Sequence, residues 1–185
     1  MNTNRISVRY AKALFEAAKE EKNIKEIAEN MEQILSASRI KDFKNFLETP
    51  VVQAGGKQKI FHSLFGQKFN SLTLKFFKLL SKNNREAYLP LIAANYIKYY
   101  KEHFNIKSAQ ITTAYSADKD LHEEIKTLVE KLYGKNTQAD VQIQTDKNLI
   151  GGFVLNIDHK QYDASISAKL KKIKNTLLNS SISEQ

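Results

Sequence analysis

The chain has 185 residues, 42% hydrophobic and 26% charged, which is ordinary for a folded soluble protein. It contains no cysteine, and this excludes disulfides, thiolate nucleophiles and cysteine metal sites. The net charge of +9 is concentrated in residues 1–105, which carry 18 basic and 10 acidic side chains, so this half favours an acidic protein, a membrane surface or nucleic acid as partner.

Hydrophobic periodicity predicts six helices in the first 105 residues. Apolar side chains recur at intervals of three and four, and the pattern is interrupted at Pro50, Gly66 and the Asn83–Asn84 pair. Pro90 fits the first turn of the sixth helix, where a missing N–H is harmless. The six predicted helices lie near residues 4–21, 24–35, 40–47, 60–65, 72–80 and 86–103.

The period changes after residue 105, where alternating apolar residues predict strands. Ile106, Ala109 and Ile111 begin this pattern, and helical periodicity returns twice. Gly151 and Gly152 are placed inside a strand, where glycine marks a bulge or a close backbone approach. The predicted strands are 106–115, 139–145 and 153–157, the predicted helices 118–134 and 166–177, and the predicted turns 146–148 and 158–160, the first closing a tight β-hairpin.

These patterns predict an α+β chain of two domains. Residues 1–105 form an N-terminal six-helix bundle, because six short helices are enough to enclose one core. Residues 106–185 form a small α/β C-terminal domain. No apolar run approaches the roughly 20 residues of a membrane span, and the first residues lack the apolar core of a secretory signal. We therefore expect a cytosolic or membrane-peripheral protein.

No catalytic, cofactor-binding or metal-binding site is indicated by the sequence. Residues 54–57 (AGGK) resemble a phosphate loop only weakly, because Val51 and Gln58 replace its first glycine and its magnesium-binding hydroxyl. This segment is better explained as the start of a helix. Aspartate near turns usually bonds the local backbone, which accounts for Asp146, Asp158 and Asp163. No two of the four histidines are spaced as a helical metal pair: His62, His103, His122 and His159.

A basic stretch from Arg39 to Glu86 leaves nucleic-acid binding open as an alternative. It carries ten Lys/Arg and three Asp/Glu, interleaved with seven phenylalanines. These phenylalanines occupy apolar helix positions and should be buried, whereas stacking on bases requires exposed rings. A solvated basic face, or one matched to an acidic protein, is the favoured interpretation.

The first predicted helix is a candidate partner surface. Tyr10 and Leu14 lie beside four alanines, and small side chains allow a second helix to approach closely while tyrosine provides a large anchor with a polar tip. The same pattern also suits a helix packed inside the bundle, and both interpretations remain open. The alanines are Ala11, Ala13, Ala17 and Ala18.

Several motifs occur in a characteristic order along the chain. They are residues 9–15 (RYAKALF), Asn84 and Arg85, Leu89 and Pro90, residues 111–115 (ITTAY), residues 149–152 (LIGG), Asp163 and Ser165. In this order and spacing, residues 5–178 resemble the delta subunit of the F-type ATP synthase, the relative of the mitochondrial oligomycin-sensitivity-conferring protein (OSCP).

The resemblance implies a non-catalytic peripheral-stalk, or stator, subunit of a proton-translocating ATP synthase. Such a subunit joins the catalytic head to the stalk so that rotor torque drives ATP synthesis. It implies a monomer within a hetero-oligomer, peripheral to the cytoplasmic face of a bacterial inner membrane, with no cofactor, metal or nucleic acid.

The resemblance also implies two partner sites. The N-terminal helix of an alpha subunit would lie in a groove between the first and fifth helices, and b-type stalk subunits would meet the C-terminal domain. The implied groove residues are Tyr10, Ala13, Leu14, Ala17, Phe76, Leu79, Leu80, Asn84 and Arg85. The implied stalk residues are Phe153, Leu155 and the face of residues 166–178.

Overall fold

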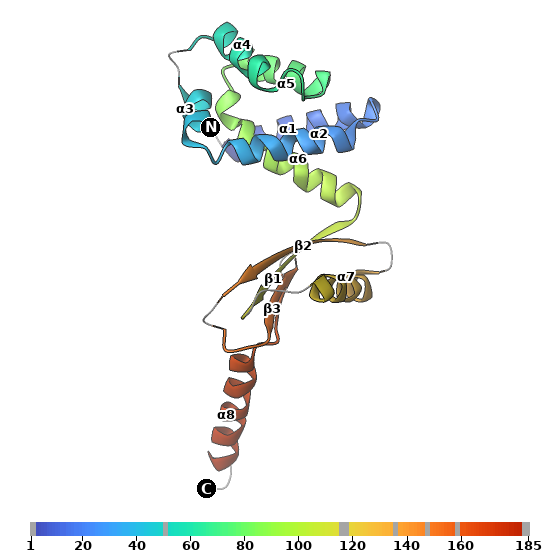
Figure 1. Cartoon of the computed structure of the whole chain (residues 1–185), viewed down its shortest axis with the longest axis vertical. Helices are drawn as coiled ribbons and strands as arrows, with labels where there is room; N and C mark the ends of the chain where they lie inside the picture. Colours follow the sequence, from blue (N-terminus) through green and yellow to red (C-terminus); the bar gives the residue numbers. More distant parts are fainter. Residues whose placement is uncertain are drawn as a thin grey trace. The chain divides into compact units, whose positions relative to one another are not determined.

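The computed structural model describes residues 3–49, 52–114, 119–134, 137–146, 149–157 and 160–182. The chain separates into two compact units, Met1–His103 and Phe104–Gln185. The predicted α+β class is confirmed, because helices occur in both units and a four-stranded mixed sheet lies in the second (Figure 1). Among the described residues, no helix is both long enough and apolar enough to cross a bilayer.

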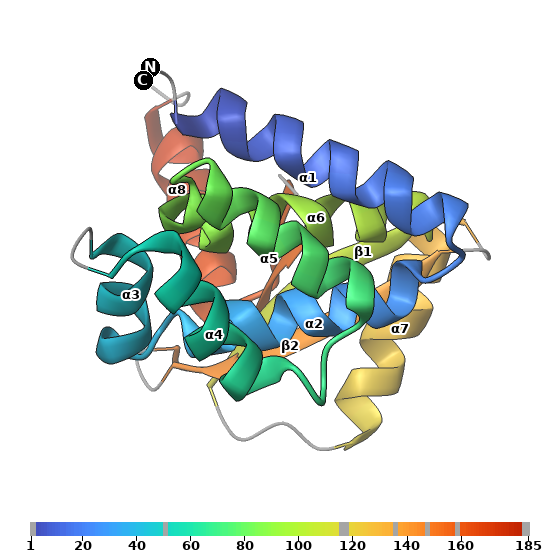
Figure 2. The same cartoon turned by 90° about the horizontal axis from the view of Figure 1, so that it is seen from above.

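All the regular secondary structure in the described residues of the first unit is helical. α6 makes its main packing contacts with α1 and α2, and α5 contacts α4 (Figure 2). The elements are α1 (Thr3–Glu20), α2 (Ile24–Ala37), α3 (Lys41–Glu48), α4 (Ala54–Phe65), α5 (Ser71–Lys82), the 3₁₀ helix η1 (Glu86–Tyr88) and α6 (Leu89–His103).

Local signals explain where these helices begin and end. Thr49 has an extended backbone (ψ 128°) because it precedes proline, and α3 stops there. The Asn70 side chain accepts a hydrogen bond from the Leu72 N–H at 2.8 Å and caps the start of α5. α4 begins at Ala54, so residues 54–57 do open a helix as predicted.

The first core is built on aromatic and small side chains. Phe15 of α1 meets Tyr96 of α6 edge to face, with ring centroids 5.6 Å apart. Ala11 and Ala18 are fully buried in the same cluster. These two alanines therefore serve packing inside the unit, whereas the sequence left them as candidates for a partner surface.

A buried ion pair joins three segments of the first unit. The Lys57 ammonium on α4 contacts the Glu86 carboxylate of η1 and donates a hydrogen bond to the Leu47 carbonyl of α3 at 3.2 Å. Both charged side chains are almost wholly buried. A buried charge is tolerated only when it is paired, so this contact holds α3, α4 and η1 together.

The second unit is a mixed sheet with helices. β1 pairs with β2 in parallel through the α7 crossover, and it pairs with β3 antiparallel; β3 then pairs with β4. The sheet order is β2-β1-β3-β4. The elements are β1 (Ile106–Thr113), α7 (Lys119–Tyr133), β2 (Gln138–Thr145), β3 (Phe153–Ile157), β4 (Lys160–Asp163) and α8 (Ile166–Ile182).

Two sequence predictions for this unit are wrong. β2 and β3 do not form a hairpin, because β1 lies between them and aligns Ile111 with both Ile143 and Leu155. Gly151 and Gly152 precede β3 and are not inside a strand. The central turn residues 147–148 and 158–159 lie outside the described residues. Periodicity correctly gave the alternation of each strand, but it carries no information on which strands are neighbours.

Candidate functional site

α1 and the end of α5 meet at Tyr10. The Tyr10 and Phe76 rings lie edge to face with centroids 6.2 Å apart. The Arg85 guanidinium donates a hydrogen bond to the Tyr10 hydroxyl at 2.7 Å and lies 5.5 Å from the centre of its ring. Two segments 75 residues apart in sequence are thus joined by a single tyrosine.

The residues around this junction differ in exposure. Ala13 and Asn84 are exposed, Ala17 is half-buried, and Leu79 keeps 48% of its surface. The core residues Leu14, Phe76 and Leu80 support this surface from beneath and offer little area to a partner. We define the α1–α5 surface as Tyr10, Ala13, Ala17, Leu79, Asn84 and Arg85.

The turn after α5 explains how Arg85 reaches α1. Asn84 has a left-handed backbone (φ 53°), which asparagine tolerates better than most residues. The Arg85 N–H then bonds the Leu80 carbonyl at 2.9 Å. This closes the end of α5 tightly and directs the Arg85 side chain to Tyr10.

A second feature is the start of α8. The Ser165 hydroxyl accepts a hydrogen bond from the Ala168 N–H at 3.1 Å, and the Asp163 carboxylate accepts one from the Ser165 N–H at 2.9 Å. Hydrogen bonds from the Ser165 hydroxyl and then from its N–H hold the pKa of Asp163 below its ordinary value of 3.8.

Gly151 and Gly152 hold the same helix start from the other side. Gly152 has φ +79°, and a Cβ added there would lie 2.4 Å from the Ala164 carbonyl oxygen. The Ile166 N–H bonds the Gly151 carbonyl at 3.0 Å, and the Ala164 N–H bonds the Phe153 carbonyl at 2.9 Å. We call Gly151 and Gly152, together with their backbone contacts to Ala164 and Ile166, the glycine clamp.

Beyond the clamp, α8 exposes an apolar stripe. Ile166, Leu170 and Ile173 recur at helical spacing, and Leu170 and Ile173 keep 55% and 56% of their surface. Phe153 is half-buried. Leu155, expected at the stalk contact, is fully buried in the core with Ile125 and Val129 of α7, which removes it from the available surface.

The alternatives that involve chemistry or nucleic acid find no support in the described residues. No group of three or more potential metal-ligating side chains occurs among them. Lys57 is engaged by Glu86 and not presented to a phosphate. None of the phenylalanines between Arg39 and Glu86 is exposed; five are buried, and Phe46 and Phe65 are half-buried. Rings in these positions offer no free faces for stacking on bases.

Comparison with known proteins decides the family. The family model described as ATP synthase delta (OSCP) subunit matches residues 6–177. The chain belongs to this family. The family supplies peripheral-stalk subunits of F-type ATP synthases, and this is the function of the chain.

Individual relatives agree with the delta-subunit assignment. ATP synthase subunit delta of Christiangramia forsetii is 33% identical over 178 residues, covering 96% of this chain and 95% of the relative. That of Carboxydothermus hydrogenoformans is also 33% identical over 178 residues, covering 96% and 99%. A chain in the cryo-EM structure of the Toxoplasma gondii mitochondrial ATP synthase hexamer shares the fold, with a TM-score of 0.68, 22% identity, and 93% and 97% coverage.

Proposed function

We propose that this delta subunit joins two partners through its two units. The first unit, acting as a six-helix bundle, binds the N-terminal helix of an alpha subunit on the α1–α5 surface. The second unit, acting as the small α/β domain, binds the b-type stalk through the α8 stripe. In this role the subunit is structural and non-catalytic, and it works at the cytoplasmic face of a bacterial inner membrane in a proton-translocating enzyme.

The Tyr10–Arg85 junction is the observation that carries the first assignment. It fixes the half-buried Tyr10 ring against Phe76 of α5, and the exposed Leu79 follows Phe76 by one helical turn, while Ala13 and Ala17 add no bulk on α1. A fixed aromatic anchor beside small residues suits a helix laid along a groove, since little side-chain entropy is lost on binding.

The α8 stripe supports the second assignment. An isolated helix that exposes isoleucine and leucine at every turn gains little from folding alone. Its apolar face would be stabilised by burial against another helix, and the stalk is the partner that the family provides. Phe153 is retained as a secondary contact, whereas Leu155 is not.

The mechanical task sets the required affinity. The rotor exerts torque on the catalytic head, and the head must be held still for ATP synthesis to proceed. A joint that survives repeated load requires nanomolar or tighter binding, about −12 kcal/mol or stronger.

The test is calorimetric titration of the full chain with a synthetic peptide of the cognate alpha subunit N-terminus, at low and high salt. We expect one-to-one binding that survives salt, because the contact is mainly apolar; nucleic-acid binding would weaken steeply. Tyr10→Asp and Leu79→Asp should each abolish it.

Leu91→Asp is the matched control, because Leu91 is exposed to 49%, about the same as Leu79, but lies on α6. All variants should keep the circular dichroism spectrum of the parent chain. Normal peptide binding by both Tyr10→Asp and Leu79→Asp would place the alpha-subunit contact elsewhere.

A further inference from the structure

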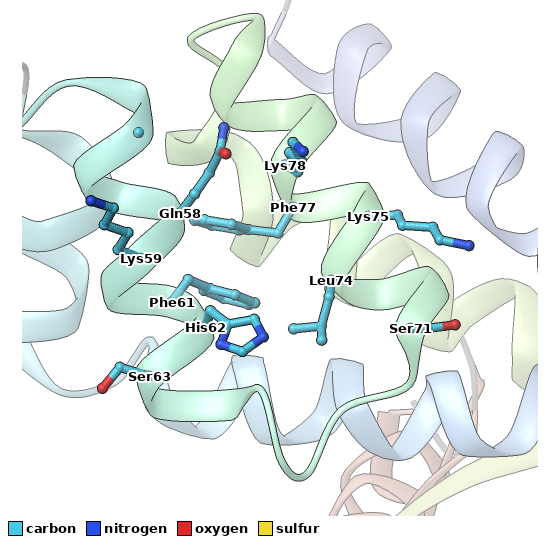
Figure 3. Close-up of a pocket in the computed structure, with 11 residues that line it drawn as sticks. Gln58, Lys59, Phe61, His62, Ser63, Ser71, Leu74, Lys75, Phe77 and Lys78 are labelled. Atoms are coloured by element: carbon cyan, nitrogen blue, oxygen red, sulfur yellow. The ribbon is translucent and has the colours of Figure 1, made fainter.

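A cleft of about 720 Å³ runs between α4 and α5. Figure 3 shows Phe61 and Phe77 lying face to face between the two helices, with Leu74 and His62 beside them. The floor is rigid, since the two phenylalanine rings stack with centroids 3.7 Å apart and are only 1% and 2% exposed.

The cleft is rimmed by cationic side chains. Lys59, Lys75 and Lys78 line it, and within the described part of the chain none of the three forms an ion pair. Figure 3 shows Lys59 and Lys75 extending outward on opposite sides. A binding partner could therefore pair with these lysines without displacing an internal carboxylate.

The sequence around the cleft also carries an excess of positive charge. Residues 49–85 contain seven Lys/Arg and no Asp or Glu. The acids that flank this stretch are Glu48, which lies 3.9 Å from Lys44, and Glu86, which contacts Lys57. The α4–α5 hairpin thus accounts for most of the excess charge of the first unit, and it presents that charge beside an apolar floor.

The cleft is distinct from the α1–α5 surface. On α5, Leu74 and Lys78 are one turn apart and line the cleft. Phe76 contacts Tyr10 of α1 on a different side of the same helix. A partner in the cleft and a helix on the α1–α5 surface could bind α5 together.

We propose that the α4–α5 cleft docks an acidic amphipathic helix from a second polypeptide. Its apolar row would lie on the half-buried Leu74 and on the aliphatic stems of Lys75 and Lys78, above the buried phenylalanine floor, and its carboxylates would pair with the Lys59 and Lys78 ammonium groups. The cleft is lined from Gly55 to Ser63 on α4 and from Ser71 to Lys78 on α5, so it is about 12 Å long, which matches two helical turns.

Charge and shape favour this occupant over two others. A bilayer contacts apolar side chains that protrude, whereas this floor is recessed between two helices. Single-stranded nucleic acid needs exposed ring faces, and Phe61 and Phe77 stack on one another instead.

The experiment uses the full chain and a fluorescein-labelled synthetic helix of about 14 residues, with leucine on one face and glutamate elsewhere. Fluorescence anisotropy should show saturable binding, and a peptide with lysine in place of glutamate should not bind. Lys78→Glu should weaken binding about ten-fold or more, because it places like charges together. Leu74→Ser should also weaken it.

Two controls locate the peptide. Lys172→Glu makes the same charge change on an exposed residue of α8 and should bind like the parent chain. Tyr10→Asp should also bind normally, so failure here is separable from failure of the alpha-subunit assignment. Because the chain has no cysteine, Ser63→Cys provides a unique thiol at the cleft for disulfide trapping of a cysteine-bearing peptide.

Three results would overturn the proposal. One is unchanged peptide affinity in Lys78→Glu, and another is loss of binding in Tyr10→Asp. The third is binding of phosphatidylglycerol vesicles or single-stranded DNA through Lys78 in the absence of peptide binding.

Discussion

The two units differ in where their apolar side chains lie. Among the described residues, the first unit buries 19 hydrophobic side chains in one cluster, and the second buries six. No α8 side chain from Ile166 to Thr176 is buried. A helix of the first unit is stabilised by its neighbours, whereas α8 has its start fixed and its apolar face left open. Exposure of this kind points to a partner more directly than any motif does.

The largest expected effect comes from breaking the buried ion pair of the first unit. Glu86→Ala leaves the Lys57 ammonium buried without a counter-charge and should lower the free energy of unfolding by about 3–5 kcal/mol. Urea unfolding followed by circular dichroism measures the change.

The ion-pair prediction has two controls. Lys57→Met combined with Glu86→Leu should recover most of the loss, because no charge is then buried. Glu102→Ala removes an exposed pair with Lys98 and should cost less than about 1 kcal/mol. Equal effects of Glu86→Ala and Glu102→Ala would show that the burial of the pair has no energetic role.

The next effect tests the glycine clamp of the second unit. Gly152→Ala forces a Cβ against the Ala164 carbonyl at positive φ and should destabilise the second unit by about 2–3 kcal/mol. Hydrogen exchange resolves the two units, and protection should fall in β3 and β4 but not in α1–α6. Gly55→Ala is the control, since nothing lies within 4 Å of its added Cβ, and it should be neutral or slightly stabilising.

A smaller effect is expected at the α8 cap. Ser165→Ala removes the acceptor for the Ala168 N–H and should cost about 1 kcal/mol, seen as lower helix content in α8 by NMR chemical shifts. Ser165→Thr should restore the content, because threonine keeps a hydroxyl that can accept from the Ala168 N–H and donate to Asp163. Loss of helix in both variants would argue against a capping role.

The Asp163 carboxyl gives this cap a pH dependence. Its pKa is lower in the folded chain than in the unfolded one, so its contribution is present above pH 3.8 and is lost as pH falls through the lower, folded value. Asp163→Asn should flatten the acid limb of α8 helix content. An identical acid limb in the variant would assign the pH dependence to other groups.

The smallest expected effect on stability concerns the α8 stripe, whose side chains are exposed and not part of either core. Leu170→Ser and Ile173→Ser should each change the free energy of unfolding by less than about 0.5 kcal/mol, because both side chains are already in water. Each should nevertheless weaken co-purification with the stalk subunits. Leu128 of α7 packs against the second core, so Leu128→Ser should lower the free energy of unfolding and leave co-purification with the stalk subunits unchanged.

The sequence predicted the elements better than their arrangement. The first-unit helices follow from apolar spacing and from Pro50 and Asn84, which are local signals. The strand order does not follow, because β2 and β3 have the alternation of a hairpin although β1 separates them. Neighbour relations in a sheet depend on the α7 crossover, which no short window of sequence contains.

The candidate surfaces were predictable in the same partial way. Tyr10 and Leu79 were expected on a partner surface, and their partner remains a proposal. The Tyr10–Arg85 hydrogen bond spans 75 residues and has no local signal. Leu14, Leu80 and Leu155 are apolar in either role, so only the packed structure shows that they are interior. The α4–α5 cleft has one signal in the sequence, which is the absence of acidic residues between 49 and 85.

The position of α6 has a consequence for how the protein is made. α1 and α2 leave the ribosome first, but their main packing partner is α6, more than 50 residues downstream of α2. Until Ile92 and Tyr96 have emerged, Phe15 and Ile27 have no core to enter. The nascent chain must therefore leave the apolar faces of α1 and α2 exposed while α3, α4 and α5 are synthesised. The core of the first unit forms only when α6 has emerged.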